Sequence, residues 1–83
     1  MLDIEQQVLA LLRSVLNLGS RAERFTAATP LIGAVPELDS MAVVSVLTAI
    51  EERFGFLIDD DEVDGSTFAS VGSLVDLVRG KLN

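Results

Sequence analysis

The chain has 83 residues, with 13 acidic and 6 basic side chains, a net charge of −7, and neither cysteine nor histidine. Its length suffices for one packed domain but not for two separate cores, and a hydrophobic content of 49% argues against disorder. The shortage of Lys and Arg argues against binding to a nucleic-acid backbone, and the missing imidazole excludes a Ser–His or Cys–His nucleophilic pair and a His-based metal site.

The sequence carries no pattern typical of export or membrane insertion. Residues 1–5 include acidic side chains and lack a basic segment leading into an apolar run, so we expect no signal peptide. No apolar stretch approaches the roughly 20 residues that span a bilayer. The absence of cysteine fits a reducing compartment. We therefore expect one monomeric, cytoplasmic domain covering residues 1–83.

The first element is predicted to be an amphipathic helix at about residues 3–17, because its apolar side chains recur at helical spacing. Asn17 and Gly19 are typical stop signals after it. Residues 19–39 contain glycines and both prolines and lack sustained periodicity, so we expect a long loop that holds at most a short helical turn. The side chains expected to hold this loop against the core are Phe25, Leu31, Ile32 and Val35.

A second helix is predicted to begin at Asp39 or Ser40, either of which can act as its N-cap. Gly55 supplies a left-handed C-cap at its end, and Arg53 complements the negative end of the helix dipole. A stripe of apolar residues runs along this helix and is widened by its neighbours, so we expect burial over much of its circumference. The stripe consists of Val43, Leu47, Ile50 and Phe54, widened by Met41, Val44 and Val46.

The rest of the chain is predicted to form an acidic loop, a single turn and a last helix. Residues 59–65 are mostly acidic, Ser66 or Thr67 begins a turn around Phe68, and residues 70–82 form an amphipathic helix. The expected fold is therefore all-α: a small four-helix bundle of three longer helices and one short helix, with the long loop between the first two. The apolar face of the last helix comprises Val71, Leu74, Val75, Val78 and Leu82.

The acidic loop invites comparison with the calcium-binding loop of an EF-hand. Asp60, Glu62, Asp64 and Gly65 fit positions one, three, five and six of that loop. Val71 then occupies position twelve, where a bidentate Glu belongs. A solvated acidic turn is the favoured interpretation, and we predict no metal site.

Ser40 is the residue on which a functional interpretation can rest. A serine at a helix start is most often a simple cap, and position alone favours that interpretation. The alternative is an exposed hydroxyl that is esterified to a phosphate, which the positive end of the helix then helps to hold. Asp39 beside it either caps the helix or helps a modifying enzyme and its metal to recognise the site, and the spacing does not choose between these roles.

Residues 36–41, Pro-Glu-Leu-Asp-Ser-Met, together with the helix that follows, resemble the acyl carrier protein family. That family shows an Asp-Ser-Leu-type motif at the start of its second helix and a Glu-Glu-x-Phe-Gly-like end to that helix, which is matched by residues 51–55. The resemblance covers nearly the whole chain and is clearest from about residue 31 to residue 78. It implies that Ser40 carries a 4′-phosphopantetheine arm, whose terminal thiol holds an acyl group as a thioester.

The resemblance further implies a carrier and not an enzyme, because the reactive thiol belongs to the cofactor. A phosphopantetheinyl transferase would modify Ser40, with Asp39 and Met41 as its neighbours in the motif. Acyl-loading and acyl-transferring enzymes would then be the partners. A discrete aminoacyl or peptidyl carrier is an alternative, as is an acidic helical adaptor protein that uses the fold without modification.

Two departures from the family pattern affect the expected pathway. Leucine is commoner in the family where Met41 stands, although the two side chains are similar in volume. The exposed front of the second helix is usually acidic in fatty-acid carriers, whereas Ala42 and Ser45 are neutral here. These differences favour a specialised pathway over housekeeping fatty-acid synthesis. The residues expected to contact partners are Met41, Val44, Glu51 and Glu52.

Overall fold

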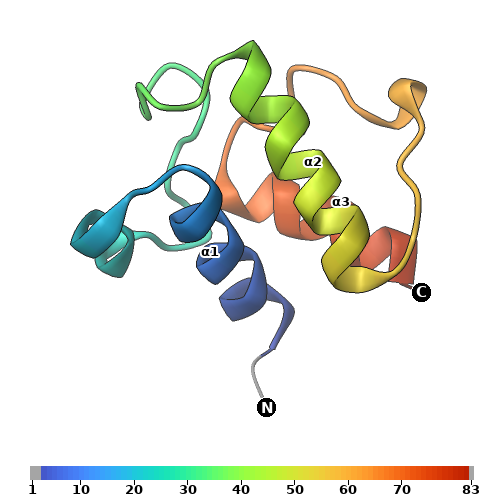
Figure 1. Ribbon diagram of the computed structural model, residues 1–83, viewed down its shortest axis with the longest axis horizontal. Helices are drawn as coiled ribbons and strands as arrows, with labels where there is room; N and C mark the ends of the chain where they lie inside the picture. Colours follow the sequence, from blue (N-terminus) through green and yellow to red (C-terminus); the bar gives the residue numbers. More distant parts are fainter. Residues whose placement is uncertain (1–2, 83) are drawn as a thin grey trace.

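The computed structural model describes residues 3–82 and consists mainly of three α-helices: α1 (Ile4–Val15), α2 (Ser40–Phe54) and α3 (Val71–Leu82). Two short 3-10 helices, η1 (Gly19–Arg24) and η2 (Asp60–Glu62), lie in the connections between them. Figure 1 shows the α1–α2 and α2–α3 connections on opposite sides of the helices. The prediction of an all-α bundle, with three longer helices and a long first loop, is confirmed. Met1 and Leu2, on which the signal-peptide prediction partly rests, lie outside the described residues.

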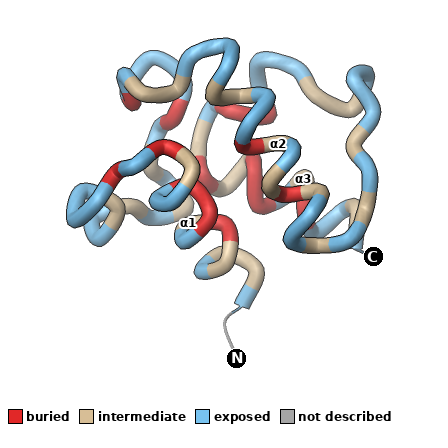
Figure 2. Tube along the Cα trace, viewed as in Figure 1, coloured by how far each residue is buried: buried red, intermediate tan, exposed pale blue. Residues whose placement is uncertain are grey.

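The core is formed by apolar side chains from all three α-helices and from the two connections. Figure 2 shows the buried segments facing one another inside the molecule, with exposed chain around them. Leu31 and Phe68, which belong to the connections, are among the largest fully buried side chains. The helices contribute Val8, Leu11 and Leu12 from α1, Val46 and Ile50 from α2, and Val71, Leu74, Val75 and Val78 from α3.

The two ends of helix α1 are set by residues next to them in the sequence. The Asp3 carboxylate accepts a hydrogen bond from the Gln6 N–H at 2.8 Å and caps the first turn. The helix ends at Val15, and Asn17 follows with a φ of 56°. Asparagine tolerates this left-handed conformation better than most residues, so Asn17 is confirmed as part of the stop signal.

The long first connection is anchored to the N-terminus of α3. Leu31 donates to the Ala69 carbonyl at 3.1 Å, and the Gly72 N–H donates to the Ala27 carbonyl at 2.7 Å. Leu31 is buried, as predicted, whereas the predicted core residue Ile32 is 51% exposed. Successive side chains of an extended segment point to opposite faces, so the burial of Leu31 turns Ile32 toward solvent.

Helix α2 has the predicted boundaries but less buried surface than predicted. Gly55 ends it with a φ of 77°, the left-handed C-cap expected there. Its fully buried side chains are Val46 and Ile50, whereas Met41 is 77% and Val44 is 61% exposed. The prediction of burial is therefore wrong for Met41 and Val44, whereas Val43, Leu47 and Phe54 are partly buried against the core. The physical reason is that α2 packs against the core by one face, and Met41 and Val44 lie on the opposite side of the helix.

The second connection contains more turn structure than predicted. Residues 64–69 form consecutive turns around the buried Phe68, as expected. The 3-10 helix η2 lies earlier, in the acidic segment. It is held by a capping box in which the Asp59 side chain accepts from the Glu62 N–H and the Glu62 side chain accepts from the Asp59 N–H. On α3, the predicted apolar residue Leu82 is 44% exposed.

Candidate functional site

Ser40 is the first residue of α2, and its side chain is exposed. The N-cap is its neighbour Asp39, whose Oδ1 accepts the Ala42 N–H at 2.8 Å. The Asp39 carbonyl accepts the Val43 N–H at 2.9 Å and so begins the helical ladder. Of the two candidate caps, the structure therefore selects Asp39, and the Ser40 hydroxyl is not needed to start the helix.

The hydroxyl of Ser40 is available for chemistry. Within the described part of the chain, Ser40 Oγ has no hydrogen-bond partner, and the N–H groups of Ser40 and Met41 have no acceptor. These N–H groups lie at the positive end of the α2 dipole, which favours a negative charge. An exposed hydroxyl beside two open donors fits a group linked through a phosphodiester, because the anion formed there gains both donors and the dipole.

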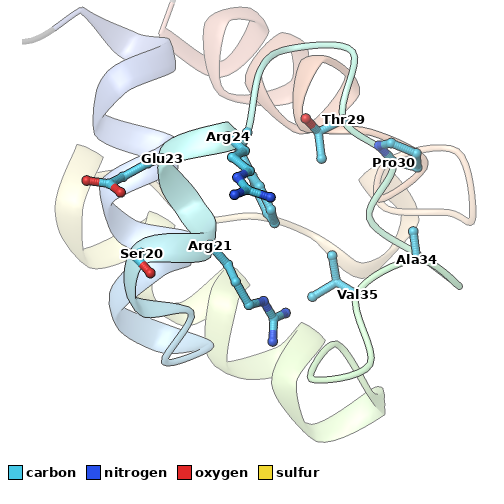
Figure 3. Close-up of a pocket in the computed structure, with 9 residues that line it drawn as sticks. Ser20, Arg21, Glu23, Arg24, Thr29, Pro30, Ala34 and Val35 are labelled. Carbon is cyan, nitrogen blue, oxygen red and sulfur yellow. The ribbon is translucent and has the colours of Figure 1, made fainter.

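The segment that leads to Ser40 is held in place from two sides. Val35 is buried, and its N–H donates to the Leu31 carbonyl at 3.0 Å. Arg21, on η1, directs its guanidinium toward this segment (Figure 3) and donates two hydrogen bonds to the Glu37 carboxylate, at 2.5 and 2.7 Å. These bonds hold the pKa of Glu37 below its ordinary value. The pair is solvent-exposed and fixes geometry more than it adds stability.

The helix face beside Ser40 is neutral and partly apolar. Met41 and Val44 are three residues apart, so they lie on the same side of α2, and both are largely exposed. Ser45 and Thr48 are exposed and uncharged. The first charged residues of α2 are Glu51 and Glu52, which at 1.5 Å per residue lie about 17 Å further along the helix axis.

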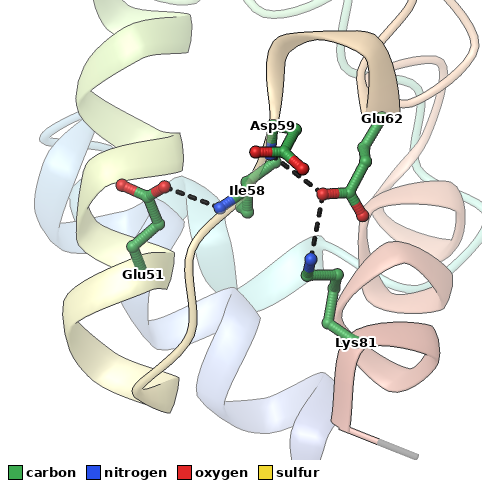
Figure 4. Close-up of polar contacts among 5 residues, drawn as sticks. All are labelled: Glu51, Ile58, Asp59, Glu62 and Lys81. Carbon is green, nitrogen blue, oxygen red and sulfur yellow. Dashed lines mark hydrogen bonds and ion pairs between the residues drawn. The ribbon is translucent and has the colours of Figure 1, made fainter.

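The structure separates the four predicted partner-contact residues into two groups. Met41 and Val44 lie beside Ser40, and the acidic pair lies near the other end of α2. Glu52 is exposed, but Glu51 is half-buried and its Oε2 accepts the Ile58 N–H at 2.8 Å (Figure 4). This hydrogen bond holds the start of the second connection against α2, a role that the sequence did not indicate.

The acidic segment has internal partners for its carboxylates. Glu62 accepts from the Asp59 N–H and from Lys81 Nζ, both at 2.9 Å, and these donors lower its pKa (Figure 4). Asp64 accepts from the hydroxyl and the N–H of Ser66, which lower the Asp64 pKa in the same way. Among residues 3–82, no group of three or more candidate metal ligands comes together.

Two hollows lie away from Ser40. One of about 490 Å³ adjoins η1, and one of about 390 Å³ lies between α1 and α2. Sequence reasoning missed both, because each forms between segments distant in the chain. In the described part of the chain, no helix is long and apolar enough to cross a membrane.

Comparison with known proteins adds to this geometry. A protein-family model described as a phosphopantetheine attachment site matches residues 6–78, a span that includes Ser40. The chain is also similar to a holo acyl carrier protein from Nitrosomonas europaea, whose structure was determined in solution by NMR. The two are 51% identical, with a TM-score of 0.88 over 99% of this chain and 98% of the other. No match was found among curated proteins.

Proposed function

The chain belongs to the phosphopantetheine-attachment family, and from this premise we propose that it is an acyl carrier protein whose Ser40 bears the 4′-phosphopantetheine arm. The single observation that supports this site is the state of the Ser40 hydroxyl, which is exposed and has no hydrogen-bond partner among residues 3–82, because Asp39 caps the helix in its place. The arm supplies a thiol, which this cysteine-free chain lacks, and acyl groups are held on it as thioesters.

The residues of the chain itself hold and orient the attachment point. Asp39 keeps the first turn of α2 closed, so that Ser40 stays at the positive end of the helix. The N–H groups of Ser40 and Met41 remain available to donate hydrogen bonds to a phosphodiester. The Arg21–Glu37 pair and the buried Val35 fix the segment that precedes the serine. The protein thus presents its cargo and leaves the reactions to partner enzymes.

The partners in this proposal are a phosphopantetheinyl transferase and the enzymes that load and transfer the acyl group. Met41 and Val44 support a recognition surface that works by apolar contact, because they are exposed next to Ser40 and the first charged side chain within α2 is Glu51. Glu52 is available at the far end of α2, whereas Glu51 is engaged with the Ile58 N–H. A neutral face of this kind favours a specialised pathway over housekeeping fatty-acid synthesis. The carrier would act there as a monomeric, cytoplasmic domain.

The proposal is tested by intact-mass measurement after incubation with coenzyme A and a broad-specificity transferase. We expect wild type to gain one phosphopantetheine group and Ser40→Ala to gain none. Ser45→Ala is the matched control, because Ser45 is exposed on the same helix and should leave the modification unchanged. A wild type that gains no mass with several transferases would indicate an unmodified adaptor instead. An aminoacyl group on the arm of the protein isolated from its own cells would indicate an aminoacyl carrier.

A further inference from the structure

The hollow beside η1, here called the η1 basin, is separate from Ser40. Its volume is about 490 Å³. It is bounded on one side by η1 and on the other by the segment that leads toward α2 (Figure 3). The lining residues are Ser20, Arg21, Glu23, Arg24, Phe25, Thr29, Pro30, Ala34 and Val35.

The η1 basin brings two guanidinium groups to one hollow of an acidic chain. Only six residues of the sequence are basic, and two of them, Arg21 and Arg24, line this one hollow. Arg21 donates two of its five N–H groups to Glu37, and the other three have no acceptor among the described residues. The Arg24 side chain has no ion pair or hydrogen bond within residues 3–82. Glu37 compensates the charge of Arg21, and Figure 3 shows the Glu23 carboxylate, which also lines the hollow, directed away from Arg21. Arg24 is therefore the guanidinium of the basin whose charge no ion pair within residues 3–82 meets.

The other wall of the η1 basin is apolar. Phe25 is half-buried and Val35 is buried, while Pro30 and Ala34 are exposed at its edge. A ligand that fits this combination has a carboxylate and an aliphatic surface beside it. Small-molecule sites enclose roughly 70–90% of their ligand, which a basin with mostly exposed walls does not do. The surface of a second protein can cover it.

We propose that the η1 basin receives an acidic side chain of a partner protein, with the carboxylate between Arg21 and Arg24 and an adjacent aliphatic side chain against Phe25 and Val35. On a carrier of net charge −7, most of the surface favours basic partner residues. One acidic residue on such a partner would find its complement in this basin, and the contact would fix the orientation of the two proteins. Since Arg21 also holds Glu37, three residues before Ser40, the contact would set the position of the attachment site on the partner.

The proposal deepens the proposed function, because the partner is taken to be an enzyme that uses the arm, but its test needs no arm. Unmodified protein is titrated with the peptide acetyl-Leu-Glu-Leu-Glu-Leu-amide while its amide spectrum is recorded. We expect saturable shifts at residues 20–25 and 29–35. The twin peptide with glutamine in place of both glutamates should bind at least roughly fivefold more weakly, the change that about 1 kcal/mol produces.

Two arginine variants and the small anion glutarate test whether the peptide binds in the η1 basin. Arg24→Gln should weaken binding of the glutamate peptide by roughly fivefold, whereas Arg79→Gln, an exposed arginine on α3, should leave it unchanged. The proposal is overturned by equal binding of the two peptides, by equal effects of the two variants, or by shifts outside the basin. Glutarate binding as tightly as the peptide would also overturn it, because the site would then serve a free anion. Failure of Ser40 to be modified affects none of these readouts.

Discussion

Replacing Asp39 by alanine tests whether this residue is the structural start of α2. Its Oδ1 accepts the Ala42 N–H at 2.8 Å, so the substitution adds one more unsatisfied donor to the first turn. Loss of an N-cap acceptor costs typically about 1 kcal/mol, within a range of 0.5–2. In a domain of this size, about 1 kcal/mol lowers the melting temperature by roughly 4–8 °C.

Urea unfolding and thermal melting measure this loss, and Asp39→Asn is the matched control. Asparagine keeps an oxygen acceptor at the same position and is about as good an N-cap as aspartate. We therefore expect Asp39→Asn to remain close to wild type and Asp39→Ala to show a lower urea midpoint with an unchanged slope. An alanine variant as stable as wild type would refute the capping role. Equal losses in both variants would assign the effect to the charge of Asp39 instead.

The same pair of variants separates capping from recognition by the modifying enzyme. If Asp39 acts on Ser40 only through the first turn of α2, Asp39→Asn should be modified at close to the wild-type rate. Asp39→Ala should be slower, because its first turn opens more often. A stable asparagine variant that is modified slowly would show that the transferase or its metal reads the carboxylate directly.

Two further predictions concern other parts of the fold. A Cβ on Gly72 would lie 2.9 Å from the Ala27 carbonyl oxygen, so Gly72→Ala should lower the free energy of unfolding by about 1–3 kcal/mol. A Cβ on Gly80 would meet open space, so Gly80→Ala should raise the free energy of unfolding by up to about 1 kcal/mol. Denaturation midpoints of the two variants that shift in the same direction from wild type would contradict these expectations. The pKa of Glu62 is lowered in the folded protein, so its contribution to stability is present above the ordinary value of 4.5 and is lost as the pH falls through the folded value. Glu62→Gln should therefore lose less stability than wild type on acidification below pH 4.5, and parallel acid titrations of the two would argue against the role of the Asp59 N–H and Lys81.

The helix boundaries were predictable because short-range chemistry fixes them. Asp39 and Gly55 act within a few residues of their own positions, through a cap hydrogen bond and a positive φ. The position of η2 was also readable in principle. Asp59 and Glu62 have the spacing of a capping box, which indicates the start of a helical turn within the acidic segment.

The exposure of individual apolar residues was not predictable from pattern alone. Met41 and Val44 belong to an apolar stretch of α2, and periodicity does not say which neighbouring elements reach them. The same limit applies to Ile32, whose direction depends on the pairing of Leu31 with Ala69. The η1 basin was unpredictable for a related reason, since residues 20–25 and 29–35 meet only after the long connection has folded back.

The division of work between Asp39 and Ser40 explains how one position can be modified without disturbing the fold. If the Ser40 hydroxyl capped α2, esterification would engage the same oxygen and would remove a structural hydrogen bond. With Asp39 Oδ1 as the acceptor, the first turn keeps its cap whether or not Ser40 carries a group. The N–H groups of Ser40 and Met41, which the cap leaves open, then become the donors that a phosphodiester can use. Attachment at Ser40 is thus compatible with an unchanged start of α2, and a serine that served as its own cap would not have this property.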